Sequence, residues 1–211
     1  MKILVACEES QAVCIAFREK GHEAYSCDLK PCSGGHSEWH IQDDAIKVAY
    51  GEYFDMMIAH PVCKRLTNSF VRWLYVPPKG KTLVEVWCEL YKAADFYIKL
   101  RNAPIKKKAL ENPVFHPYAK IYLGDVKRQI VQPHYFGDPF FKATGFELIG
   151  LSELKRTHWM TIPKKGTEEH KKWSYIHRLP PGPDRETLRS KTFPGIAAAM
   201  ASQWSCDKIC R

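Results

Sequence analysis

Two residues with reactive side chains, Cys63 and Glu111, each lie just past a short apolar run of the kind that forms a buried strand. A thiolate is a strong nucleophile and a carboxyl group can hold or pass on a proton, so the pair has the groups for covalent catalysis. Each residue also has a simpler interpretation. The Pro61-x-Cys63 loop is more often structural than catalytic, and Glu111 followed by Asn112 and a proline is an ordinary strand exit.

Polar residues near other predicted strand ends could bind a ligand. Asp28 follows the run 22–27, and ligands of α/β folds gather at the carboxyl ends of strands, so Asp28 is suited to hold a ribose. The alternative for Asp28 is an ordinary turn or helix-cap aspartate. His60, beside Pro61, is suited to contact a cofactor or a base, although a polar side chain that lines a loop is the more common outcome.

The apolar pattern predicts strands that alternate with helices. Strands are expected at 2–7, 22–27, 53–59, 106–110, 126–132 and 146–151, and helices from a Ser10 cap to Gly21, at 83–100 and at 193–204. We therefore expect an α/β fold, a Rossmann-like three-layer sandwich with a mostly parallel central sheet. Residues 1–211 should form a single domain, from which the polar, Pro-rich stretch at about 152–190 departs as an excursion or small flap.

Composition and charge narrow the classes of protein. The chain has 211 residues, 45% of them hydrophobic, and no apolar run reaches the roughly 18 residues of a membrane span. The N-terminus turns acidic at Glu8 and Glu9 before a signal-peptide core can form. The eight cysteines are scattered and lack the framework of a disulfide-stapled secreted domain. We therefore expect a soluble, cytoplasmic protein with free thiols and no contact with a membrane.

The positive charge favours a polyanionic partner. Lysine and arginine number 32 against 23 acidic residues, a formal net charge of +9. Basic pairs and triplets lie at 106–108, 164–165 and 171–172, with Trp159 and Trp173 among the interleaved aromatic residues. This mixture suits phosphate contact and base stacking, although any one cluster could also be a solvated basic face.

Four residues have a spacing that invites comparison with zinc sites: Cys27, Cys32, His36 and His40. The first gap is longer than that of a tight zinc knuckle, and two glycines between the second and third residues would leave the ligands loosely placed. A structural zinc site is therefore the minor alternative, and no metal is expected.

Taken in order over nearly the whole chain, these segments resemble the DNA cytosine-5 methyltransferases, in particular small proteins of the phage or prophage type. The resemblance implies S-adenosylmethionine as cofactor, and no metal. Ile3 to Glu8 is similar to the first cofactor strand and loop, and the segment 190–194 is similar to the last motif, which returns to the cofactor. The implied cofactor residues are Cys7, Glu8, Asp28 at the ribose, Asp44 at the adenine, His60, Pro61 and Thr192.

The same resemblance assigns the reaction. Cys63 matches the nucleophile, Glu111 and Asn112 the pair that grips the target pyrimidine, and Lys142 a basic residue that assists there. A thiolate that adds to carbon 6 turns the ring into an enamine, and this makes carbon 5 nucleophilic enough to take a methyl group. We expect nearby Lys64, Arg65 or a helix start to lower the pKa of Cys63. The base must be flipped out or already single-stranded.

The chain also departs from the family pattern. The first loop contains no glycine, Val62 separates proline from cysteine, and Lys142 stands where the family has arginines. No segment is long enough for a full target-recognition domain, so a partner chain is a possible source of recognition. Two alternatives follow: methylation of a free pyrimidine nucleotide or RNA, and a catalytically inactive nucleic-acid-binding protein. A phage-encoded protein would act in the cytoplasm of the host cell.

Overall fold

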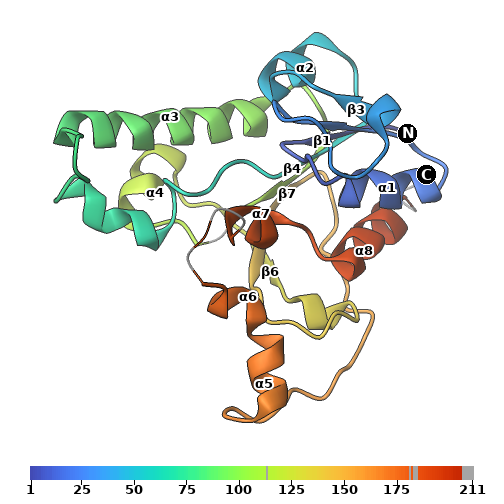
Figure 1. The fold of residues 1–211 in the computed structure, drawn as a ribbon. Helices are drawn as coiled ribbons and strands as arrows, with labels where there is room; N and C mark the ends of the chain where they lie inside the picture. The colour runs from blue at the N-terminus through green and yellow to red at the C-terminus, as the bar shows by residue number, and fades with distance from the viewer. Residues whose placement is uncertain (113, 181, 183–184, 206–211) are drawn as a thin grey trace.

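A seven-stranded sheet forms the centre of the computed structural model, which describes residues 1–112, 114–180, 182 and 185–205 (Figure 1). The strand order is β3-β2-β1-β4-β5-β7-β6, and β7 runs antiparallel to both neighbours while the other pairs are parallel. The strands are β1 (Lys2–Ala6), β2 (Glu23–Cys27), β3 (His40–Ile41), β4 (Met56–Ala59), β5 (Lys107–Glu111), β6 (Gln129–Val131) and β7 (Thr144–Ile149). The prediction of an α/β fold with a mostly parallel sheet is confirmed.

Helices cover both faces of the sheet. They are α1 (Ala12–Glu19), α2 (Ala45–Gly51), α3 (Leu83–Asn102), α4 (Pro117–Leu123), α5 (Glu168–Trp173), α6 (Tyr175–Arg178), α7 (Arg185–Ser190) and α8 (Pro194–Ser205), with 3-10 turns η1 (Ser37–Trp39), η2 (Asn68–Leu74) and η3 (Pro133–Tyr135). Successive residues of a strand point to opposite faces, so Leu4 packs in one core with α2, α3 and α4, and Val5 in the other with α1 and α8. This gives the expected three layers.

The best-predicted helix is α3, which begins at Leu83 as expected and ends two residues beyond the predicted 83–100. Thr82 and Glu85 form a capping box, in which each side chain binds the backbone N–H of the other residue. The buried residues recur every three or four positions, which gives the helix one apolar face: Val86, Leu90, Ala94, Tyr97 and Leu100.

The start of α1 differs from the prediction. Ser10 is not the cap; Gln11 takes that position with a φ of 59° and makes no side-chain cap. The carboxylate of Glu8 instead accepts hydrogen bonds from the N–H groups of Val13 at 2.7 Å and Cys14 at 3.2 Å. An upstream acidic side chain therefore satisfies the free N–H groups of the first helical turn.

The stretch expected as an excursion contains both irregular chain and short helices. Residues 152–164 have no regular secondary structure, and α5 and α6 then project away from the sheet (Figure 1). The elements that sequence reasoning missed include β3 and α2, which lie in and just after a turn-rich segment. Among the described residues, no helix is both long and apolar enough to cross a membrane, and the six described cysteines are free thiols. Cys206, Cys210 and Pro113 lie outside the described residues.

Candidate active site

The site lies at the carboxyl edge of the sheet, where the strand order reverses. From β1 the chain builds the sheet outward through β2 and β3 on one side, and through β4 and β5 on the other. Such a switch point leaves a crevice between neighbouring loops, and ligands of open α/β sheets bind there. The parallel register pairs Ala6 with Ala59 and Ala59 with Leu110, so the residues that follow β1, β4 and β5 share one edge.

His60 and Glu111 form an ion pair at this edge. Nδ1 of His60 lies 2.6 Å from Oε2 of Glu111, and only 11% and 17% of the two side chains are exposed. Burial by itself lowers the pKa of His60, but the hydrogen bond and charge of Glu111 outweigh it, and the net pKa is raised. The same contact lowers the pKa of Glu111, although burial of its carboxyl group would by itself raise that pKa. The pair therefore holds its proton on the imidazole.

Buried Glu8 adds a second carboxyl group to this pair. Its charge raises the pKa of His60, while burial raises the pKa of Glu8 itself in spite of the two backbone N–H groups that it accepts. The Nε2 atom of His60 is buried and has no hydrogen-bond partner among the described residues. An unpaired buried polar atom is costly, so this one is well placed to receive a polar group of a ligand.

Cys63 lies in the loop after β4, within the electrostatic field of the same groups. Burial and the negative charge of Glu111 raise the pKa of Cys63, whereas Lys142 and Arg189 lower it. The prediction of a lowered pKa is therefore wrong for the free protein. Arg65, one of the residues expected to lower it, is instead paired with Glu89 at 2.8 Å. At rest the side chain is a thiol with two cations nearby.

Lys142 comes to the site from the connection between β6 and β7. Its charge acts on the ionisation of His60, Cys63 and Glu111. Its amino group also donates a hydrogen bond to the carbonyl of Lys191 at 3.2 Å, which ties the site to the segment before α8. The structure thus places Cys63, Glu111 and Lys142 within electrostatic range of one another.

Asn112 is placed differently from Glu111. It is fully buried, its backbone N–H donates to the carbonyl of Gly145 at 2.8 Å, and neither polar atom of its side chain has a partner among the described residues. Glu111, by contrast, is the last residue of β5, and its side chain is paired with His60. Pro61 is likewise buried, beneath the exposed Val62.

The predicted cofactor residues gather around the ends of β1, β2 and β3. Burial raises the pKa of Cys7, and the charges of Asp28 and Asp44 raise it further, so the three lie in one electrostatic cluster. Asp28 accepts the N–H of Lys30 at 3.0 Å, and Asp44 caps α2 through the N–H of Ile46 at 2.7 Å. Both aspartates therefore also have the turn and cap roles of ordinary acidic residues.

The glycine-free first loop adopts the left-handed backbone without glycine. Cys7 has a φ of 60° and Gln11 a φ of 59°, values that are uncommon for residues with a side chain. Gln11 is fully buried, and its side chain binds both the carbonyl (2.8 Å) and the N–H (3.0 Å) of His36. Gly34 fits against it, because a Cβ there would lie 2.6 Å from Cβ of Gln11.

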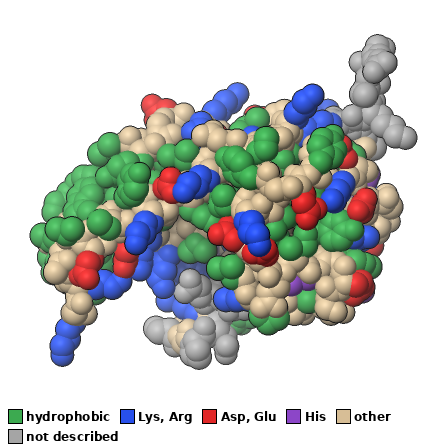
Figure 2. Space-filling view, turned by 90° about the horizontal axis from the view of Figure 1, so that it is seen from above, with side chains coloured by type: hydrophobic (Ala, Val, Ile, Leu, Met, Phe, Trp, Pro, Cys, Tyr) green, Lys and Arg blue, Asp and Glu red, His purple; other side chains and the backbone are tan. Residues whose placement is uncertain are grey.

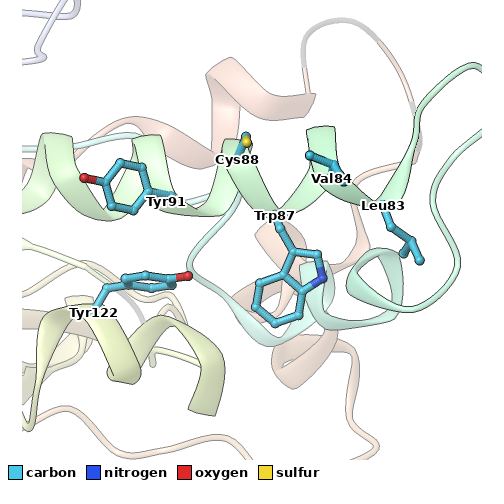
Figure 3. Close-up of a pocket in the computed structure, with 6 residues that line it drawn as sticks. All are labelled: Leu83, Val84, Trp87, Cys88, Tyr91 and Tyr122. Atoms are coloured by element: carbon cyan, nitrogen blue, oxygen red, sulfur yellow. The ribbon is translucent and has the colours of Figure 1, made fainter.

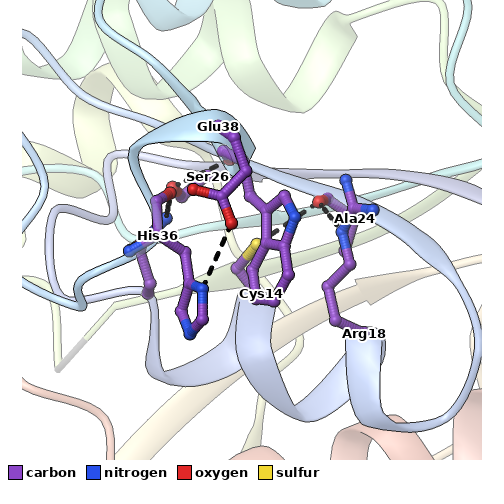
Figure 4. Close-up of polar contacts among 8 residues, drawn as sticks. Cys14, Arg18, Ala24, Ser26, His36 and Glu38 are labelled. Atoms are coloured by element: carbon purple, nitrogen blue, oxygen red, sulfur yellow. Dashed lines mark hydrogen bonds and ion pairs between the residues drawn. The ribbon is translucent and has the colours of Figure 1, made fainter.

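Helix α1 is fixed to β2 beside this loop (Figure 4). The carbonyl of Ala24 accepts hydrogen bonds from Nε of Arg18 at 2.7 Å and from Sγ of Cys14 at 3.4 Å. The ring of His36 stacks on that of Trp39 with centroids 3.9 Å apart, and its Nδ1 lies 3.3 Å from a carboxylate oxygen of Glu38. No group of three or more His, Cys, Asp or Glu side chains in the described part of the chain is arranged to hold a metal ion, so the zinc alternative finds no site there.

A pocket of about 350 Å³ connects the first loop with the start of α8. It is lined by Ser10, Ala12, Ser33 and residues 191–194, and so it includes the predicted Thr192. Gly195 holds this arrangement together: its N–H donates to Oδ2 of Asp138 at 2.8 Å, and a Cβ on it would lie 2.3 Å from the carbonyl oxygen of Phe136. Sequence reasoning did not identify Gln11, Gly34 or Gly195 as residues that shape the site.

A second pocket, of about 390 Å³, lies away from these residues on the outer face of α3 and α4 (Figure 3). Its lining is apolar: Leu83, Val84, Trp87, Cys88, Tyr91 and Tyr122. Hydrophobic side chains gather at the left end of the molecule in Figure 2, over α3. This second pocket contains none of the predicted site residues.

Comparison with known proteins identifies no family. No family model matches the chain. No curated protein matches it. What bears on function is therefore the chemistry of the residues at the carboxyl edge of the sheet.

Proposed function

We propose that this protein is an S-adenosylmethionine-dependent methyltransferase that acts on carbon 5 of cytosine in DNA, with Cys63 as nucleophile. The observation that carries the proposal is the convergence of Cys63, Glu111 and Lys142 in one electrostatic cluster at the switch point of the sheet. They come from the loop after β4, the last residue of β5 and the connection between β6 and β7. The seven-stranded sheet with one antiparallel strand is compatible with the methyltransferase fold that the resemblance implies.

The nucleophilic step uses Cys63 and the groups that control its charge. The thiolate forms an S–C6 bond with the pyrimidine, and the displaced electron pair moves toward N3, which takes up a proton. Carbon 5 then forms its bond to the incoming methyl group. Loss of the proton from carbon 5 and cleavage of the S–C6 bond regenerate the thiolate and the aromatic ring. S-adenosylmethionine, when bound, would supply the methyl group by cleavage of its sulfonium–methyl bond, whose electron pair stays on sulfur and leaves S-adenosylhomocysteine.

Substrate binding itself would activate the thiol. In the free protein the Glu111 carboxylate raises the pKa of Cys63, while Lys142 and Arg189 oppose it. When Glu111 shares a proton with the base, its negative charge is neutralised and only the two cations remain to act on the sulfur. The pKa of Cys63 then falls, because a cation near a thiol favours the thiolate.

His60 takes a different role from the cofactor contact expected of it. Its Nδ1 holds Oε2 of Glu111 and orients the carboxyl group, and the proton of the pair resides on the imidazole. When that proton passes to the carboxyl group, Glu111 can donate to N3 of the pyrimidine and take the proton back when the thiolate leaves. His60 is thus a positioning residue that also stores the proton.

The residues near α1 and α8 fit a small cofactor. The pocket of about 350 Å³ falls within the roughly 300–1,000 Å³ that is typical of ligand sites. Cys7, Asp28 and Asp44 would hold the adenosine half at the ends of β1, β2 and β3, and Thr192 would close the pocket from the segment before α8. The left-handed turn at Cys7 keeps the loop short where the family pattern uses glycine.

One observation favours the second candidate, a nucleic-acid-binding protein without activity. The first N–H groups of α1, a natural anion site, are already occupied by Glu8, and so they are not free for a ligand. The net charge of +9 supports a nucleic-acid partner in either case. A partner chain that supplies target recognition, and RNA or a free nucleotide as substrate, stay within the proposal as variants of it.

Two measurements test the proposal. Mass spectrometry of nucleosides from DNA of cells that express the protein should show new 5-methylcytosine, and cells that express Cys63→Ser should not. DNA with 5-fluorocytosine should trap the wild type covalently, because fluorine cannot leave as the proton does, and should not trap Cys63→Ser. Methyl transfer without any covalent adduct would instead indicate attack by an exocyclic amine.

A further inference from the structure

Trp159 is the most exposed large hydrophobic side chain among the described residues, with 77% of its surface accessible. It lies in the stretch without regular secondary structure that precedes α5. A tryptophan normally buries much of its large apolar ring, so a ring left in water needs an explanation. A mobile, unanchored loop would be one explanation, but the backbone contacts around it argue against a loose loop.

The backbone beside Trp159 is anchored at two places. The side chain of Gln203, on α8, donates to the carbonyl of Lys155 at 2.8 Å and accepts its N–H at 2.7 Å. The carbonyl of Tyr135 accepts the N–H groups of Thr157 and His158, both at 3.0 Å. The chain that leads to the exposed ring is thus held against α8 and η3.

The side chain of Arg156 packs against the exposed ring of Trp159. Its guanidinium lies 4.9 Å from the centre of the Tyr135 ring and 5.6 Å from that of Trp159, and its Nε donates to the carbonyl of His158. Tyr135 and Trp159 therefore flank one cation. Stacking of a guanidinium on aromatic rings fixes the orientation of both groups and leaves the outer part of the tryptophan free.

The charged residues nearest Trp159 in the sequence are of one sign, and Glu153 and Glu168 border this basic stretch on either side. The sequence from 154 to 167 contains Lys155, Arg156, Lys164 and Lys165 and no acidic residue. The stretch also contacts Tyr135, which belongs to the same β6–β7 connection as Lys142. A partner that offers flat aromatic faces together with negative charge matches both features.

We propose that Trp159, braced by Arg156, is a stacking site for an unpaired base of a nucleic acid, whose phosphates lie along the basic stretch 155–165. The choice of a nucleic acid as the ligand rests on the proposed function, but base stacking on Trp159 does not require methyl transfer. It gives the excursion a role: to hold the strand that contains the target base beside the crevice.

The test separates stacking from charge by means of two labelled single strands of equal length, oligothymidylate and its abasic counterpart, measured by fluorescence anisotropy. Wild type should bind the strand with bases more tightly, because each stacked base contributes about 1–3 kcal/mol, roughly 5- to 150-fold in affinity. Trp159→Ala should lose that preference and retain the weaker, salt-dependent binding that both strands share. Trp159→Phe should keep most of it.

Tyr53→Ala is the matched control, since Tyr53 is 76% exposed but precedes β4 at the opposite edge of the sheet. It should bind both strands as the wild type does, and thermal melting should show that all variants remain folded. Equal binding of both strands by the wild type, or an unchanged preference in Trp159→Ala, would overturn the stacking site. The anisotropy assay needs neither cofactor nor methyl transfer, so a failure of the catalytic proposal would not change the interpretation of this result.

Discussion

The two halves of the carboxyl edge are built in different ways. On the side of β4 and β5, Cys63, His60 and Glu111 act on one another through charge and a single short hydrogen bond. On the side of β1 and β2, Gln11 and Gly34 act through shape, with a left-handed backbone and a close approach between loops. The first half should therefore respond to changes of charge and pH, and the second to changes of volume.

Among the changes that leave the Cys63 nucleophile in place, the largest effect is expected from Glu111→Gln. The amide keeps the size of the side chain but cannot accept the His60 proton or pass it to a base. Methyl transfer should fall by about 10²–10⁴-fold, the range of a positioned acid–base group. Steady-state and single-turnover rates on cytosine-containing DNA would measure it.

A control on the other carboxylates at this edge sharpens the result. Asp28→Asn keeps a turn-forming side chain at the end of β2, and it should change the affinity for the cofactor more than the rate of a bound complex. Equal losses of rate in the two variants would mean that Glu111 has no special part in the chemistry.

An intermediate effect is expected from Gly34→Ala, which tests the half that depends on shape. The added Cβ would lie 2.6 Å from Cβ of Gln11 and 2.7 Å from the carbonyl oxygen of Ser10. Overpacking of this kind costs about 1–3 kcal/mol, so denaturant unfolding should show a loss of that size. Calorimetry with S-adenosylmethionine should show weaker binding as well.

Gly51→Ala serves as its control, because a Cβ at that position meets no atom within 4 Å and the backbone is not left-handed. It should leave both stability and cofactor affinity close to those of the wild type. A Gly34→Ala protein that is as stable as Gly51→Ala would mean that the contact between the two loops relaxes freely.

The sequence predicted the part of the site that depends on motif order. Cys63 and Glu111 were each placed just past a strand end and Lys142 in a later loop, and the parallel pairing of β4 with β5 brings the first two to one edge. The long buried strands and α3 were also predictable, because their apolar periodicity is strong. The two-residue strand β3 has too few residues to show any period.

Other features depend on contacts between distant segments. The pairing of His60 with Glu111 spans 51 residues and depends on the register of two strands, which no local pattern specifies. The left-handed Cys7 and Gln11 were unpredictable for another reason: sequence reasoning assigns that conformation to glycine. The raised pKa of Cys63 arises from burial, which is a property of the folded chain alone.

The smallest effect concerns the pH dependence of stability, which measures the His60–Glu111 pair without any substrate. The pKa of His60 is raised in the folded state, so its contribution is fully present below the ordinary value of 6.5 and is lost as the pH rises through the folded value. The pKa of Glu111 is lowered, so its contribution is present above 4.5 and is lost as the pH falls through the folded value. The pair should therefore stabilise the protein most between these limits.

His60→Gln should lower the free energy of unfolding most near pH 5.5 and progressively less toward pH 8.5, as followed by denaturant unfolding at several pH values (experimental settings, roughly on either side of the ordinary histidine pKa). His22→Gln is the informative control, because burial and the nearby N-terminal charge lower the pKa of His22. Its contribution has the opposite sign: the wild type should lose stability at that site as the pH falls through the ordinary histidine pKa of about 6.5, and the variant should not. If His60→Gln changed stability equally at all pH values, the pair would be joined by a neutral hydrogen bond, and the proton store assigned to His60 would have to be withdrawn.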